Sequence, residues 1–124
     1  MQVGFKVIRA SGAESANSVD LPDPKDDPLG KKTWTIVRAK VCEVIGEEND
    51  PEHVRVWHDG RYLDMFVDET GANDGLPVNP KATAIYHANV LHHDPNGRDA
   101  LEIKAGRAPK IHGDAVLFLE PVWR

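Results

Sequence analysis

The chain has 124 residues, 40% of them apolar and 28% charged, and its formal net charge is −5. A chain of this length can bury roughly two-thirds of its unfolded surface, so we expect a single domain over residues 1–124 with one hydrophobic core. No apolar run approaches the roughly 20 residues that span a bilayer, so no membrane contact is expected. The net negative charge disfavours a nucleic-acid partner, because phosphate backbones are bound by clustered Lys and Arg.

The sequence favours a reducing compartment without export. The segment MQVGFKVIRA lacks the apolar core and the small-residue cleavage site of a secretory signal, so we expect a cytoplasmic protein. Cys42 is the only cysteine, which rules out a disulfide within the chain and any cluster of thiolates. A lone cysteine is more often a small core residue than a nucleophile, and Cys42 is predicted to lie in the core.

The first 45 residues predict a strand, a long loop and a segment of ambiguous type. Residues 2–10 alternate apolar and polar side chains, which is typical of a strand. Residues 11–30 lose this pattern and end in LPDPKDDPLG, so they are predicted to form one long loop that covers a surface or is mobile. In residues 31–45 apolar side chains recur at helical spacing, although the β-branched content favours a strand. Gly46 is a typical helix stop, and we therefore predict a helix.

A β-hairpin is the clearest local prediction. Two alternating runs in EHVRVWHDGRYLDMFVDE flank Asp59-Gly60, the residue pair preferred in a two-residue type I′ turn. This turn fixes the register, so that His58 opposes Arg61 and the pairs continue outward to His53 and Phe66. The two sides of the hairpin then differ: one is aliphatic (Val54, Val56, Leu63, Met65 and Val67), and the other is aromatic and charged (His53, Arg55, Trp57, Tyr62, Asp64 and Phe66).

The remaining sequence predicts a second helix and a last strand. Residues 79 to about 91 have a helical pattern, and DAVLFLEPV near the end is typical of a buried strand. ALEIKA, residues 100–105, is a weak strand candidate. The resulting order, β-α-β-β-α-β, is typical of the split βαβ or ferredoxin-like α+β fold, an antiparallel sheet of four strands with two helices on one face.

In that fold the helices cover the aliphatic side of the hairpin, which leaves the other side as a candidate binding surface. Its predicted binding residues are Arg55, Trp57, Tyr62, Asp64 and Phe66. This side is expected to be covered, either by residues 11–30 or by another chain. Trp, Tyr and Arg are enriched as anchors of protein interfaces, so a protein partner or a second copy of the chain is the favoured occupant. Stacking of single-stranded bases is the alternative, and the acidic charge weighs against it.

No catalytic set, metal site or cofactor is predicted, and enzyme activity is disfavoured. His87 lies about 120° or more around a helix from His92 and His93, so these residues do not form the i, i+4 pair of a helical zinc motif. Whether the histidines converge in the fold stays open. No Gly-x-Ser-x-Gly elbow or phosphate-binding glycine loop occurs. Asp68 and Glu69 point to opposite sides of a strand and are predicted to form a solvated strand end.

The start of the second helix is a further candidate site. In GLPVNPKATAIY, residues 75–86, Asn79 is a favoured N-cap and Pro80 suits the first helical position. The unpaired N–H groups of a first turn can hold a small anion or a partner's carboxylate. Asn79, Thr83 and Tyr86 are therefore additional candidate binding residues.

Two stretches of the chain, EHVRVWHDG through HANVL and IHGDAVLFLEPVW, carry a family resemblance. A strand ending in DMFVDE, a Gly/Leu/Pro/Asn turn, an Ala/Thr-rich helix with AIY and a late GDAVLF strand resemble an uncharacterised family of small proteins from bacteriophages, prophages and bacterial genomes, a domain of unknown function. The resemblance implies a phage or mobile-element origin and an intracellular life in a bacterium. It implies no activity, and no catalytic residue follows from it.

Three functional hypotheses follow from the sequence. The leading one is a non-enzymatic binding or accessory protein of phage or mobile-element type that acts through protein contacts or self-association. The second is a protein that binds a small ligand, a nucleotide or a metal, or an enzyme, through the region 68–86. The third is an acidic decoy of a host DNA-binding or defence protein, based on the net charge.

Overall fold

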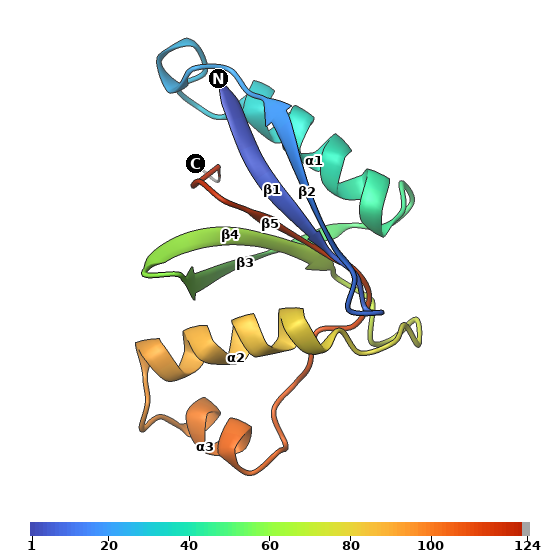
Figure 1. Cartoon of the computed structure of the whole chain (residues 1–124), viewed down its shortest axis with the longest axis vertical. Coiled ribbons are helices and arrows are strands. Elements are labelled where there is room, and N and C mark those ends of the chain that lie inside the picture. The colour runs from blue at the N-terminus through green and yellow to red at the C-terminus, as the bar shows by residue number, and fades with distance from the viewer. Residues whose placement is uncertain (123–124) are drawn as a thin grey trace.

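The computed structural model describes residues 1–122 and shows an α+β fold built on one five-stranded antiparallel sheet (Figure 1). The strand order is β2-β1-β5-β4-β3. The strands are β1 (Gln2–Ile8), β2 (Glu14–Asp20), β3 (Pro51–His58), β4 (Arg61–Asp68) and β5 (Ala115–Phe118). The helices are α1 (Lys31–Ile45), α2 (Pro80–His93) and α3 (Arg98–Lys104), with a short 3-10 turn, η1, at Pro24–Asp26.

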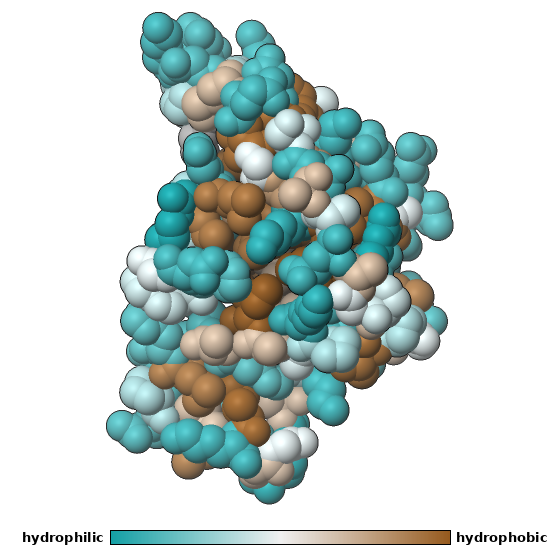
Figure 2. All heavy atoms as spheres, viewed as in Figure 1, coloured by the Kyte–Doolittle hydropathy of each residue, from teal (hydrophilic) through white to brown (hydrophobic). Residues whose placement is uncertain are grey.

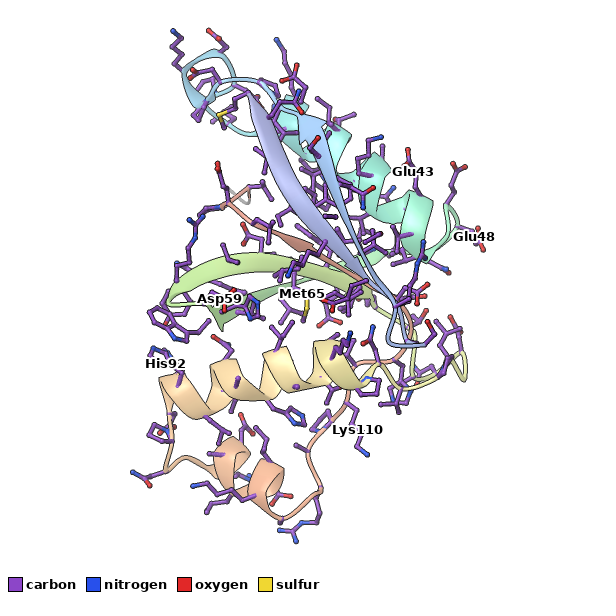
Figure 3. All side chains as sticks on the ribbon, viewed as in Figure 1. Glu43, Glu48, Asp59, Met65, His92 and Lys110 are labelled. Atoms are coloured by element: carbon purple, nitrogen blue, oxygen red, sulfur yellow. The ribbon has the colours of Figure 1, made fainter. Side chains whose placement is uncertain are left out.

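The two longer helices lie on opposite faces of the sheet, and α3 lies against α2 on the side away from the sheet (Figure 1). Neighbouring residues of the central strand β4 show this arrangement, because alternate side chains of a strand point to opposite faces. Phe66 is fully buried in the core under α1, and Met65 is fully buried in the core under α2. Figure 3 shows Met65 between β4 and α2. The sheet is therefore covered on both sides at its centre.

The two cores differ in composition. The core under α1 contains Phe5, Phe66 and Phe118, and the Phe118 ring contacts the other two, with ring centroids 5.3 Å from Phe5 and 5.8 Å from Phe66. The core under α2 is aliphatic and includes Ile8, Val56, Leu63, Met65 and Leu117. On the side seen in Figure 2, hydrophilic side chains predominate at the surface and hydrophobic ones form separate patches.

The antiparallel α+β class is confirmed, but the predicted ferredoxin-like arrangement differs from the structure in two respects. The sheet has five strands in the order β2-β1-β5-β4-β3 rather than four, and the helices cover both faces rather than one. The prediction assumed that the side of the hairpin opposite the aliphatic one faces solvent. That side contains Phe66, which is fully buried under α1.

The predicted loop over 11–30 is wrong for most of its first half, because residues 14–20 form β2, paired with β1 in continuous register from Gln2↔Asp20 to Ile8↔Glu14. Val19 is the only buried residue of β2. A strand at the edge of the sheet with one buried side chain carries no hydrophobic alternation, so its sequence resembles a loop. ALEIKA, in turn, lies mostly within the short helix α3 rather than in a strand.

Helix α1 and the β3–β4 hairpin are confirmed. Residues 31–45 are helical, and Gly46, with φ of 108°, ends the helix and donates its N–H to the Cys42 carbonyl. The hairpin has the predicted register from His58↔Arg61 to His53↔Phe66. Asp59 and Gly60 both adopt positive φ, 51° and 81°, as a type I′ turn requires.

Two further sequence expectations concern the core and the membrane. Cys42 is buried near the C-terminal end of α1, as predicted, with its Sγ 3.8 Å from the Asn49 carbonyl oxygen. Among residues 1–122, none of the helices has the length and apolar character needed to cross a bilayer.

Candidate functional site

The predicted binding side of the hairpin is divided in the structure. Phe66 is buried among Trp34 and Phe118, with ring centroids 5.7 and 5.8 Å away. Asp64 is only 5% exposed, and its carboxylate contacts His53 Nε2 at 2.6 Å and accepts the Val122 N–H at 2.8 Å. The prediction of Phe66 and Asp64 as surface binding residues is therefore wrong: both hold the α1 side of the sheet and the C-terminal segment together.

The other three hairpin residues form an aromatic cluster beside α2. The Trp57 ring stacks on His92, with centroids 4.1 Å apart and planes 4° from parallel, and meets Tyr62 edge-on at 4.9 Å. The Arg55 guanidinium lies 4.7 Å from the centre of the Tyr62 ring, within range of a cation–π interaction. Trp57 and Tyr62 are half-buried, whereas Arg55 and His92 are exposed.

The end of α2 is held at this cluster by a bond to the sheet edge. β3 is an edge strand, so some of its backbone groups have no neighbouring strand to pair with. Asn89 Oδ1 accepts the N–H of Trp57 at 2.8 Å. This bond brings the C-terminal half of α2 against the hairpin, and Figure 3 shows His92 near the hairpin tip at Asp59.

A hollow of about 350 Å³ lies between the hairpin and α2, lined by Arg55, Tyr62, Asn89 and His93. We refer to it as the hairpin hollow. Its lining combines an aromatic ring, an amide and two side chains that carry or can gain positive charge. Such a surface can hold a carboxylate together with an apolar group.

The histidines do not converge, which answers the question left open by the sequence. His87 Nε2 lies 2.8 Å from the Pro109 carbonyl oxygen, His112 Nδ1 lies 2.8 Å from the Leu76 carbonyl oxygen, and His92 stacks on Trp57. In the described part of the chain, no three His, Cys, Asp or Glu side chains form a group that could hold a metal ion.

The predicted cap of the second helix is confirmed, but its residues serve the fold. Asn79 is fully buried, and its Oδ1 accepts the Ala82 N–H at 3.1 Å. Its Nδ2 donates to the carbonyls of Ile8 and Gly113, at 2.8 and 2.9 Å. Asn79 therefore joins β1, α2 and the segment before β5. The Ala82 N–H is occupied by this bond, so it is not available to the anion expected at the helix start.

Thr83 and Tyr86 have structural contacts as well. Thr83 is buried, and its Oγ1 accepts the Ile111 N–H at 2.9 Å. Tyr86 is half-buried and packs against the aliphatic core under α2. Together with Asn79, these residues fix α2 to residues 111–113.

A second cavity lies at the other end of the sheet, around Asp68. It measures about 200 Å³ and is lined by Ala10, Val44, Ile45, Asp68, Leu76, Pro77, Gly113 and Asp114. We call it the Asp68 cavity. Asp68 is only 6% exposed, so the prediction of a solvated strand end is wrong for this residue, whereas Glu69 is exposed as expected.

The Asp68 cavity is assembled from segments that are far apart in the sequence, and glycine permits their close approach. A Cβ on Gly71 would lie 2.5 Å from the His112 carbonyl oxygen, too close for any other residue type. Gly113 has a φ of 86°, a left-handed conformation that favours glycine. The DMFVDE, GLPVNP and GDAVLF stretches all contribute residues to this cavity.

Comparison with protein-family models, with curated proteins and with solved structures finds no match for this chain. The two cavities are therefore interpreted from their own geometry. Sequence reasoning missed Asn89 and His92 as partners of the hairpin, because nothing in the local pattern of α2 indicates that it lies against the edge of β3. Sequence reasoning also missed the burial of Asp68, because the segments that line its cavity are distant in the sequence.

Proposed function

We propose that this protein is a non-enzymatic binding protein that acts through protein contacts, and that the hairpin hollow is its contact surface. The observation that carries the proposal is the position of Arg55. Its exposed guanidinium rests on the Tyr62 ring beside the stacked Trp57 and His92 rings. None of the ion pairs formed within residues 1–122 involves Arg55. Aromatic and Arg side chains that are held in place but partly exposed are typical interface anchors.

The chemistry of the hollow favours a partner that offers a carboxylate next to an apolar side chain. A carboxylate can bind the Arg55 guanidinium through two parallel hydrogen bonds, and His93 lines the same hollow. The apolar group would pack on the edges of Trp57 and Tyr62. The chain as a whole is acidic, with a net charge of −5, whereas this surface presents an arginine and a histidine. We therefore expect this surface to bind acidic groups of a partner.

The cellular setting is part of the proposal. The sequence resemblance supports a phage or mobile-element origin, and that origin supports a partner in the bacterial cytoplasm. A second copy of the chain is a competing occupant, since its own acidic side chains could enter the hollow.

The proposal can be tested by selecting short random peptides on the immobilised protein and measuring their affinities by calorimetry. We expect the selected peptides to share an Asp or Glu next to an apolar residue. Arg55→Gln and Trp57→Ala should each weaken binding about tenfold or more. The matched control Arg38→Gln removes an arginine from α1 that does not line the hollow, and it should leave the affinity unchanged.

Two outcomes would contradict the proposal. One is selection of peptides without a carboxylate, and the other is equal affinity of the wild type and Arg55→Gln. Light scattering after size-exclusion chromatography tests whether a second copy of the chain occupies the hollow. A wild-type dimer that becomes a monomer in Arg55→Gln would identify the partner as a second copy.

A further inference from the structure

Asp68 is a buried carboxyl group whose two oxygens are only partly satisfied by the described residues. Its Oδ1 accepts the Thr70 N–H at 3.0 Å and lies 3.3 Å from the Thr70 Oγ1. Its Oδ2 is buried and has no hydrogen-bond partner among the described residues. A buried carboxylate oxygen without a donor is strongly unfavourable. None of residues 1–122 supplies the donor that Oδ2 lacks.

The Asp68 cavity offers room for such a donor. Its volume of about 200 Å³ is several times the roughly 30 Å³ that one water molecule occupies in the liquid. Most of its wall is apolar: Val44 and Ile45 come from α1, and Leu76 and Pro77 come from the loop before α2. An apolar wall beside a carboxylate suits a molecule with an apolar body and a single polar end.

The charge of the cavity determines the polar end. Asp114 is the second carboxylate of the lining, but it already accepts the Arg9 Nη1–H and the Ala10 N–H, both at 2.9 Å. Asp68 Oδ2, by contrast, lacks a hydrogen-bond donor. A positively charged donor would both donate this bond and balance the negative charge of an ionised carboxylate. A divalent cation would need about six oxygen ligands, more than these two carboxylates supply.

We propose that the Asp68 cavity binds a primary alkylammonium group, which donates to the Asp68 carboxylate while its alkyl chain packs on Val44, Ile45 and Leu76. This site is separate from the hairpin hollow and does not depend on the function proposed for it. The ammonium can belong to a small free amine or to the side chain of a lysine, and both sources present the same chemistry to the cavity.

The test is a titration of the full chain followed by two-dimensional amide NMR. The probes are n-butylammonium chloride, the uncharged 1-butanol as its matched control, and Nα-acetyl-lysine amide for the lysine source. We expect butylammonium to give saturable shifts confined to the residues around the cavity, and butanol to give none. Saturation by the lysine amide at lower concentration would assign the site to a lysine; tighter binding of butylammonium would assign it to a small amine.

Variants isolate the carboxylate. Asp68→Asn keeps the shape and the Oδ1 acceptor but removes the charge, and it should weaken butylammonium binding about tenfold or more. Glu69→Gln removes a neighbouring exposed carboxylate and should change nothing. If Asp68→Asn fails to fold, Ala10→Leu fills the cavity from its wall and should abolish binding. Absence of saturable shifts, equal shifts with butanol, or unchanged affinity in a folded Asp68→Asn or Ala10→Leu would overturn the proposal.

Discussion

The two faces of the sheet are closed by helices of different kinds. Helix α1 buries Thr33, Val37, Val41 and Cys42 against an aromatic core. Helix α2 buries only Ala82 and Thr83, and its larger apolar side chains remain partly exposed. Burial of apolar area stabilises the first helix strongly, whereas the second has much less to bury.

Hydrogen bonds compensate for the weak packing of α2. Asn79, Thr83 and Asn89 each bind backbone groups outside the helix, in β1, β3 and residues 111–113. Side-chain bonds of this kind are directional, so they specify where a helix sits even when few large side chains interlock. Helix α1 is therefore held mainly by the packing of large side chains, and α2 mainly by side-chain hydrogen bonds. Four substitutions test this difference.

The largest effect is expected from Phe66→Ala on the α1 face. Phe66 is fully buried and contacts the rings of Trp34, His53 and Phe118, so its removal leaves a cavity and should lower the free energy of unfolding by about 3–5 kcal/mol. Urea denaturation followed by circular dichroism measures the change. The control Leu101→Ala truncates an exposed side chain and should shift the midpoint little; comparable losses in the two variants would contradict the packing account.

Asn79→Ala should follow, with a loss of about 3 kcal/mol, because it leaves the Ile8 and Gly113 carbonyls and the Ala82 N–H unpaired in the interior. Asn79→Asp separates the two roles of the side chain. Aspartate keeps the acceptor that caps α2 but loses both donors. If Asn79 served only as a cap, Asn79→Asp would be nearly as stable as the wild type in urea denaturation; we expect it to be clearly destabilised.

A smaller effect, about 1 kcal/mol, is expected from Asn89→Ala, which removes the acceptor of the Trp57 N–H. Loss of this bond should also loosen the contact between His92 and the indole, and the tryptophan fluorescence should shift to longer wavelength. Asn17→Ala, at an exposed position of β2, is the matched control. An unchanged spectrum and midpoint in Asn89→Ala would mean that α2 is held at β3 by packing alone.

The smallest effect concerns Lys81, in the first turn of α2, which bonds Glu14 of β2 at 2.8 Å. The hydrogen bond and charge of Lys81 lower the pKa of Glu14, so this contact contributes stability above the unfolded pKa and loses it as the pH falls through the folded pKa. In Lys81→Ala, an NMR titration should show the Glu14 pKa rising toward its usual value. Lys25→Ala should leave the Glu14 pKa unchanged. If Lys81→Ala also left it unchanged, Lys81 would not be the cause of the lowered pKa.

The sequence predicted the elements whose signals are local. Asp59-Gly60 determined both the turn and the register of the hairpin, and Gly46 marked the end of α1. It could not predict β2, because an exposed edge strand with one buried residue has no periodic hydrophobic signal. The sequence also could not assign α2 to the second face of the sheet. Side chains on both faces of β4 are buried, and their pattern does not show which helix covers which face.

The candidate sites show the same division. Asn79 was identified as a cap from its neighbours, and that bond is present, but its bonds to Ile8 and Gly113 join segments that only the tertiary structure brings together. Arg55, Trp57 and Tyr62 were grouped correctly from the hairpin register. Their neighbour His92 and the cavity beside Asp68 arise from contacts between distant segments.

The reactivity of the Cys42 thiol can report when the helices detach from the two faces of the sheet. Its thiol is buried beneath the end of α1 and is the only one in the sequence, so a thiol reagent can reach it only when that end of the helix detaches or the whole chain unfolds. Comparing the labelling rate of the wild type with that of Asn79→Ala would show whether loss of the α2 anchor also frees α1. A rate that rises in step with the global destabilisation would mean that the two sides of the sheet come apart as one cooperative unit.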